Sequence, residues 1–156
     1  MDMFSNVVVF EDVPAYDSLT KYILGGIIAS TFIAGIVLLA FEVIGAVIMF
    51  VATAIDAVVI RAALPKRFEI YEDRLKIVLP GPFHLTIPFR DIIRVGQATK
   101  DTAWIYWGIR FSTSSKYLVE IERKNGMNVI LSPSMEDRFI EQLEQVRGNW
   151  KEPGIF

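Results

Sequence analysis

The chain has 156 residues, 53% of them apolar, and its mean hydropathy of +0.40 is high for a water-soluble protein. Its 16 basic and 18 acidic side chains give a pI of about 5.4, which excludes the concentrated basic surface of a nucleic-acid-binding protein. The absence of cysteine excludes disulfide bonds, cysteine-ligated zinc and thiol catalysis.

Residues 1–20 form an acidic N-terminal tail, with four acidic and no basic side chains. Residues 7–10 of this tail are an apolar, β-prone run that would be adhesive if it were left exposed. We therefore expect this run to pair with a sheet edge, or to lie against its own or a neighbouring domain.

Residues 21–64 have the composition of a transmembrane helical hairpin. Between residues 22 and 63 the only charged side chains are Glu42, Asp56 and Arg61. Residues 22–41 supply 20 uncharged residues, roughly 30 Å of helix, which matches the hydrocarbon core of a bilayer. Residues 43–60 supply a second apolar stretch of almost membrane-spanning length. Asp17 or Ser18 is a suitable N-cap for the first helix. A single buried or re-entrant segment is the alternative, although it would not need two such lengths.

Basic residues flank the hairpin at its two ends but not at its turn. Lys21 precedes the first helix, Arg61, Lys66 and Arg67 end or follow the second, and the turn offers only Glu42. Because basic flanks favour the cytoplasmic side, the sequence predicts a multi-pass protein of the cell membrane with both termini cytoplasmic.

Two features inside the hairpin are functional candidates. Gly26, Ser30 and Ala34 recur every fourth residue and form a stripe of small side chains on which a helix can pack closely, either the second helix of the hairpin or a helix of another copy. Asp56 is the one charge well inside a span. It lies roughly 7 Å along the helix axis from Arg61, so we expect it to snorkel towards the cytoplasmic headgroups or to pair with that arginine; proton or ion handling is the minority hypothesis.

Residues 65–150 have the pattern of a separate domain of short strands and one helix, before a tail at residues 151–156. Asn125-Gly126 is the strongest hairpin turn signal, Ser132-Pro133 favours a helix start, and Gly148 is a suitable helix terminator. Seven strands are predicted, at residues 67–72, 74–79, 84–89, 91–96, 105–112, 117–123 and 127–131. The helix has one apolar face, formed by Met135, Phe139, Ile140, Leu143 and Val146.

Several segments together resemble the bacterial pleckstrin-homology-like (PH-like) membrane proteins. They are RFEIYEDRLKIV, IPFRDIIRV, WGIRF and YLVEIERKNGMNVILSP followed by the helix of Phe139, and the resemblance covers residues 66–147. The two-helix hairpin in front is also similar to that group's arrangement. The resemblance implies an α+β membrane protein: a transmembrane hairpin, then a PH-like antiparallel β-barrel or sandwich of about seven strands, capped by a C-terminal helix.

The same resemblance implies a non-enzymatic module at the cytoplasmic face of the membrane. Eukaryotic PH domains that bind phosphoinositides generally use a basic cluster in the first strand-to-strand loop, whereas the turn here, Glu72-Asp73-Arg74, is mostly acidic. Phosphoinositide binding is therefore not expected.

The residues offer little for catalysis. His84 is the only histidine, so a histidine-based metal cluster is impossible, and no glycine-rich phosphate loop is present outside the spans. We therefore expect no enzymatic activity and no cofactor.

Aromatic and basic residues are candidates for contact with the membrane surface or for an interface. Residues 98–107 contain Trp104 and Trp107 beside Lys100, and this segment either dips into the headgroup region or packs inside the domain. Lys66 and Arg67 could add attraction to anionic lipid, at about 1 kcal/mol for each basic side chain.

The leading hypothesis from the sequence is a scaffold that presents its PH-like domain for self-assembly or for docking another membrane protein. The expected partners are the lipid bilayer and a second copy or a membrane protein, and not nucleic acid. The alternative is an accessory subunit of a transport or channel complex, in which Asp56 and the small-residue stripe line or seal a path. Replacing Asp56 by asparagine separates these hypotheses.

Overall fold

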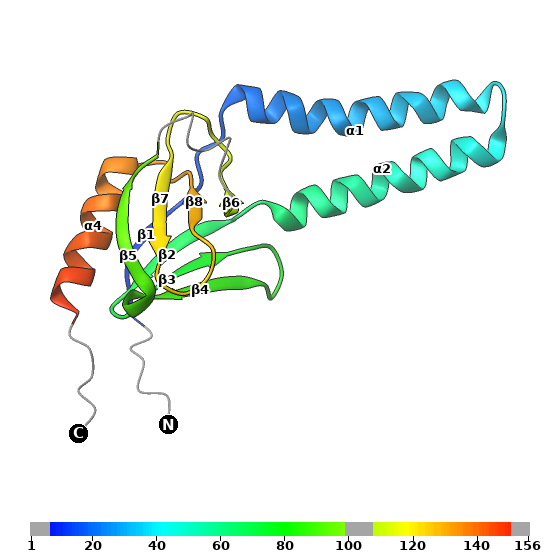
Figure 1. Cartoon of the computed structure of the whole chain (residues 1–156). Helices are drawn as coiled ribbons and strands as arrows, with labels where there is room; N and C mark the ends of the chain where they lie inside the picture. Colours follow the sequence, from blue (N-terminus) through cyan, green and yellow to red (C-terminus); the bar gives the residue numbers. More distant parts are fainter. Residues whose placement is uncertain (1–6, 99–107, 151–156) are drawn as a thin grey trace.

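The computed structural model of the chain describes residues 7–98 and 108–150. A helical hairpin projects from one side of a β-rich domain, and a C-terminal helix covers the opposite side of that domain (Figure 1). In chain order the described elements are β1 (Val8–Asp12), α1 (Ser18–Leu39), α2 (Val43–Ala63), β2 (Arg67–Tyr71), β3 (Arg74–Val78), β4 (His84–Pro88), the 3-10 turn η1 (Phe89–Asp91), β5 (Ile92–Gln97), β6 (Ile109–Phe111), β7 (Val119–Arg123), β8 (Val129–Leu131) and α4 (Glu136–Asn149).

The strands form two four-stranded sheets, in the orders β1-β2-β3-β4 and β5-β7-β8-β6. All seven predicted strands are present, and β1 adds an eighth from the N-terminal tail, which confirms that this apolar run pairs with a sheet edge. The strands pair antiparallel as expected, with one exception among the described pairs: β6 runs parallel to β8. Among the described strands the two sheets do not join into a closed barrel, so of the two expected forms the sandwich describes the domain.

The main apolar core lies between the two sheets and α4. Alternation along β3 buries Leu75 and Ile77 and leaves the other three residues of the strand half-exposed, as expected for a strand with one face on a core. From α4, Phe139 and Leu143 complete the core, and the ring of Phe139 meets Phe68 edge-on at 6.0 Å between centroids.

The C-terminal helix begins later than its sequence signals suggest. The predicted start at Ser132-Pro133 is wrong, because α4 begins at Glu136 and Pro133 instead forms an isolated antiparallel bridge with Pro14. Met135, expected on the apolar face, is 42% exposed, since it lies before the first helical turn. The helix also continues through Gly148 to Asn149.

Strand direction decides which turns of the domain lie near the hairpin. β2 starts four residues after the end of α2 and runs away from the hairpin for roughly 17 Å. The β2–β3 turn therefore lies far from the hairpin, whereas β3 runs back and brings the β3–β4 turn to the hairpin side (Figure 1).

Candidate functional site

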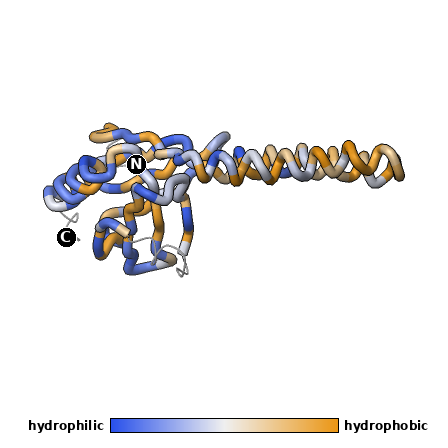
Figure 2. The backbone as a smooth tube through the Cα atoms, turned by 90° about the horizontal axis from the view of Figure 1, so that it is seen from above, coloured by the Kyte–Doolittle hydropathy of each residue, from blue (hydrophilic) through white to orange (hydrophobic). Residues whose placement is uncertain are grey.

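The outer surface of the hairpin is apolar and almost entirely exposed. Both helices are long and apolar enough to cross a membrane, and nearly all their residues lie outside any protein core (Figure 2). Phe41, at the tip of the hairpin, is 83% exposed. Exposed apolar surface of this extent is costly in water, and a bilayer is an environment that removes that cost.

The two helices meet along a seam with one very close contact. A Cβ atom added at Gly35 would lie 2.9 Å from the ring of Phe50, whose neighbour across the seam is Phe32, at 5.5 Å between ring centroids. Gly35 and Ala46 are the buried residues of the two helices. Small residues at these positions let the helices approach, as in other helix pairs in lipid.

The predicted small-residue stripe does not form this seam. Gly26 has no atom within 4 Å of an added Cβ, Ser30 is exposed, and only Ala34 is half-buried. The hypothesis that the stripe packs against the second helix of the same hairpin is therefore wrong at Gly26 and Ser30. The close contact uses Gly35, one residue further along, which the four-residue spacing did not single out.

Asp56 faces the other helix instead of the end of its own. Its carboxylate accepts a hydrogen bond from the Thr31 hydroxyl at 3.3 Å, and it is half-buried in the seam. Within the described residues it makes no ion pair with Arg61, so the predicted pairing is not formed. Arg61 is exposed and lies near Tyr16 and Lys66, where the hairpin joins the domain.

The N-terminal segment clamps the hairpin to the domain. Asp17 caps α1 by accepting from the amide of Thr20 at 2.7 Å, which confirms the predicted cap. The same carboxylate accepts from the amide and the hydroxyl of Ser115, at 2.7 and 2.9 Å. The amides of Thr20 and Ser115 hold the pKa of Asp17 well below its usual value. One carboxylate thus fixes the start of α1 against the segment between β6 and β7.

A second acidic residue of the tail caps the C-terminal helix. Asp12 is buried, and its carboxylate accepts from the Met135 amide at 3.0 Å and from the Ser134 hydroxyl. Asp12 thereby satisfies the amide of Met135, the N-cap residue of α4, whose own side chain makes no capping hydrogen bond. The hydroxyl of Ser132, expected to cap this helix, donates to the carbonyl of Ser114 instead. The sequence showed an acidic tail but gave no sign of these distant partners.

The predicted membrane-surface residues have different environments. Lys66 is exposed at the hairpin junction, but Arg67 pairs with Glu69 at 2.7 Å and with Glu11 at 3.6 Å. The charge of Arg67 is therefore largely matched within the protein, which weakens its role as a lipid-binding cation. Lys100, Trp104 and Trp107 lie outside the described residues.

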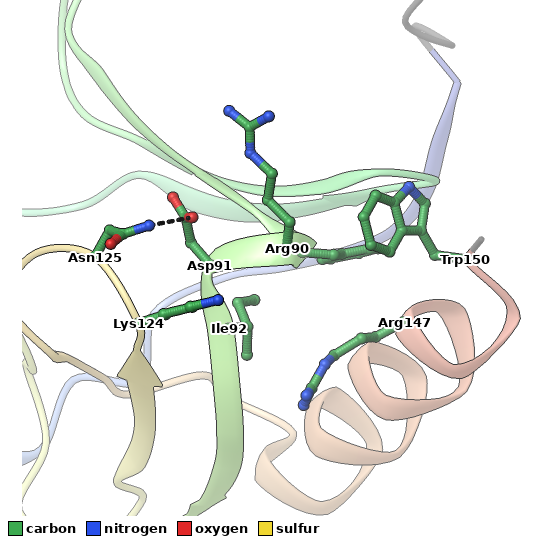
Figure 3. Close-up of a pocket in the computed structure, with 8 residues that line it drawn as sticks. Arg90, Asp91, Ile92, Lys124, Asn125, Arg147 and Trp150 are labelled. Atoms are coloured by element: carbon green, nitrogen blue, oxygen red, sulfur yellow. Dashed lines mark hydrogen bonds between the residues drawn. The ribbon is translucent and has the colours of Figure 1, made fainter. Parts of the chain in front are cut away.

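An open recess of about 560 Å³ lies where α4 ends, on the side of the domain away from the hairpin. Its basic residues are Arg90, Lys124 and Arg147, and its acidic residue, Asp91, accepts from the Asn125 amide at 3.2 Å. Figure 3 shows Arg90 extending away from Lys124 and Arg147. The three cations therefore surround the recess without converging on one point.

The acidic β2–β3 turn lies on this same distant side. Asp73 pairs with Arg74 at 3.2 Å. In a bilayer that holds the hairpin, this turn would be directed away from the lipid surface.

The family model described as "Bacterial PH domain" matches residues 66–147, slightly more than half of the chain. The matched segment runs from the residue before β2 into the last turn of α4 and leaves β1 and both hairpin helices outside. No curated protein matches the chain.

Proposed function

Because the chain belongs to the bacterial PH domain family, we propose that it is a non-enzymatic membrane scaffold, whose domain docks a protein partner or a second copy. The observation that carries this proposal is the pair of exposed apolar helices projecting from a folded domain (Figure 2). The bilayer takes up the hairpin and holds the domain at its cytoplasmic face, with both termini on that side. Tethering raises the local concentration of the domain for whatever it binds.

The junction supports a tether that also sets orientation. Asp17 joins the start of α1 to Ser115, and the hydroxyl of Tyr16 donates to the Pro65 carbonyl just beyond α2 at 3.3 Å. Both ends of the hairpin are therefore attached to the domain by short contacts. A scaffold held in this way presents the same face to the cytosol in every copy, which favours ordered assembly over loose crowding.

The only histidine of the sequence lies on the surface of the domain. His84 is exposed, and its ring nitrogen Nδ1 lies 3.3 Å from the Pro82 carbonyl, within its own turn. In the described part of the chain, no group of three or more acidic or histidine side chains is placed to hold a metal ion. The binding surface that suits a scaffold best is the basic recess, because it faces away from the lipid.

The mass of the full chain in detergent or in lipid nanodiscs tests the scaffold proposal. We expect a mass of two or more copies, or a stable complex with a second protein. Replacing Lys124 by glutamate should reduce a complex that uses the recess, whereas Lys116→Glu, an exposed change elsewhere on the domain, should not. A strictly monomeric protein without a partner would contradict scaffolding.

Membrane orientation has a separate test, because the chain has no cysteine of its own. Single cysteines at Phe41 and at Ile93 can be labelled in intact cells with a reagent that does not cross membranes. Only the cysteine at the hairpin tip should react before lysis, and both should react afterwards. Reaction at residue 93 in intact cells would overturn the cytoplasmic placement of the domain.

The contact between Thr31 and Asp56 favours a second candidate, an accessory subunit of a transport or channel complex. Polar side chains inside a membrane span are energetically costly, so they are usually paired with each other or belong to a pathway for a substrate or ion. Replacing Asp56 by asparagine keeps a hydrogen-bond acceptor but removes the ionisable group. Transport should fail in this variant if the second candidate is correct, while scaffold assembly should survive.

A further inference from the structure

The β3–β4 turn lies close to the end of α2, where the hairpin joins the domain. The amide of Lys66, three residues beyond α2, donates to the Val78 carbonyl at 2.7 Å, and Val78 pairs with His84 on the next strand. The turn between these strands therefore lies beside the end of α2, and Figure 1 shows it on the hairpin side of the domain. Pro80 of this turn lines a recess together with Arg61 and Leu64 of the hairpin.

This turn presents one large apolar side chain on a constrained backbone. Phe83 is 64% exposed. Its carbonyl accepts from the Leu79 amide at 3.1 Å, which closes the turn, and Gly81 has a φ of +79°, a conformation that favours glycine. Pro80 and Pro82 on either side of that glycine each have a restricted φ. A phenylalanine held in this way loses little freedom when it is inserted into another phase.

Charge around the turn fits a lipid surface. Arg61 and Lys66 are exposed beside it, and neither forms an ion pair with another described residue. Basic side chains at this level attract the anionic headgroups of a bilayer. An isolated exposed phenylalanine needs no explanation by itself. Here its turn lies where two membrane-length helices join the domain, and Pro80 of the same turn lies beside the exposed Arg61 and Lys66, so a lipid surface is the partner that fits.

We propose that Phe83 and the β3–β4 turn form a second membrane contact, inserted into the headgroup region of the bilayer that holds the hairpin. This inference rests on the proposed membrane anchoring. Aromatic rings prefer this interfacial region, and the flanking Arg61 and Lys66 contact lipid phosphate there. The contact limits rocking of the domain about the hairpin, so that the recess at the end of α4 stays directed away from the membrane.

Single-cysteine variants of the full chain, labelled with an environment-sensitive dye, test this contact in vesicles that contain brominated and anionic lipids. The test position is Phe83→Cys. Ile93→Cys is the matched control, because residue 93 is 51% exposed and its carbonyl binds Arg147 of α4, on the side away from the hairpin. Val51→Cys, at an exposed position in α2, reports whether the hairpin is in lipid.

We expect strong quenching at residue 51, and quenching at residue 83 that exceeds quenching at residue 93 severalfold. Strong quenching at 51 with no difference between 83 and 93 would overturn the second contact and leave the anchoring intact. Absence of quenching at 51 would overturn both the second contact and the membrane anchoring.

A second experiment separates the effect of the Phe83 side chain from that of a dye placed at its position. A dye attached at His84→Cys reports on the same turn while Phe83 is still present. Adding Phe83→Ser should then lower its quenching, and an unchanged value would contradict the role of Phe83.

Discussion

Single side chains of the N-terminal segment connect parts of the molecule that are far apart in sequence. Asp12 caps α4, more than a hundred residues away, and Asp17 caps α1 while also holding Ser115. Carboxylates are effective in this role, because a bond from a backbone amide to a charged acceptor is stronger than one to a neutral acceptor. Substitutions at these two residues should therefore affect elements that are remote from them.

Replacing Asp17 by alanine should destabilise the protein by about 1 kcal/mol, or roughly 4–8 °C in melting temperature for a domain of this size. The pKa of Asp17 is lowered in the folded state, so its ionised form stabilises the fold above the unfolded pKa of about 3.9. This advantage should fade as the pH falls below that value. Melting curves of both proteins between pH 3 and 7 measure it, and a gap that is independent of pH would contradict the electrostatic account.

Gly35 and Gly26 make a matched pair for the seam and the outer stripe of α1. Gly35→Leu should force the helices apart at Phe50, at a cost of about 1–3 kcal/mol typical of overpacking, whereas Gly26→Leu has open space and should leave the hairpin unchanged. Distances between spin labels on α1 and α2 report the first effect. If the stripe is an oligomer seam, Gly26→Leu should lower only the oligomeric mass, and equal effects of both changes would contradict this division.

At the scale of elements, β1 is the addition that the matched family segment does not contain. It pairs antiparallel with β2 and covers an edge that would otherwise be open. The ring of its Phe10 also packs edge-on against Phe139, with 6.5 Å between the ring centroids, so the strand is attached to the core as well as to the sheet. Because β1 leads directly into Asp12 and Asp17, it also fixes the entry to the hairpin.

Removing residues 2–12 should lower the melting temperature and increase aggregation, because the β2 edge and the start of α4 lose their partners. Removing residues 2–6, which precede β1, is the control and should have little effect. Thermal unfolding followed by light scattering measures both properties. Equal behaviour of the two deletions would show that β1 contributes nothing to edge protection.

At the scale of the whole molecule, the hairpin and the domain depend on different sources of stability. The domain has a core shared by both sheets and α4, whereas the hairpin buries few residues and has its apolar surface outside. The hairpin is therefore expected to remain helical in lipid even when the domain unfolds.

Phe139→Ala should test this separation, because Phe139 is fully buried and contacts rings from both β1 and β2. The loss of a buried phenylalanine costs about 3–5 kcal/mol, enough to unfold a small domain. Limited proteolysis in vesicles should digest the domain of the variant and leave a protected fragment containing α1 and α2. Met135→Ala, at a position that is 42% exposed and outside the buried core, is the control. Loss of the hairpin fragment as well would contradict independent stability.

The sequence by itself determined the membrane-length hairpin, the strands and the apolar face of the last helix. These features follow from the composition and periodicity of neighbouring residues, as at Leu75 and Ile77 or Phe139 and Leu143. The turn at Gly126, with its positive φ, was predictable for the same reason. The family resemblance over residues 66–147 added the fold.

Only the tertiary structure decided the contacts between distant residues. It joined Asp56 to Thr31 and Asp12 to the start of α4 by hydrogen bonds, and it placed β6 parallel to β8. It also brought Phe83 to the hairpin end of the domain, through the register of β3 with β4. The physical reason is that a hydrogen bond or a close packing contact depends on where the chain returns in space. Local composition specifies which element forms, but it does not specify which distant atom will lie beside it.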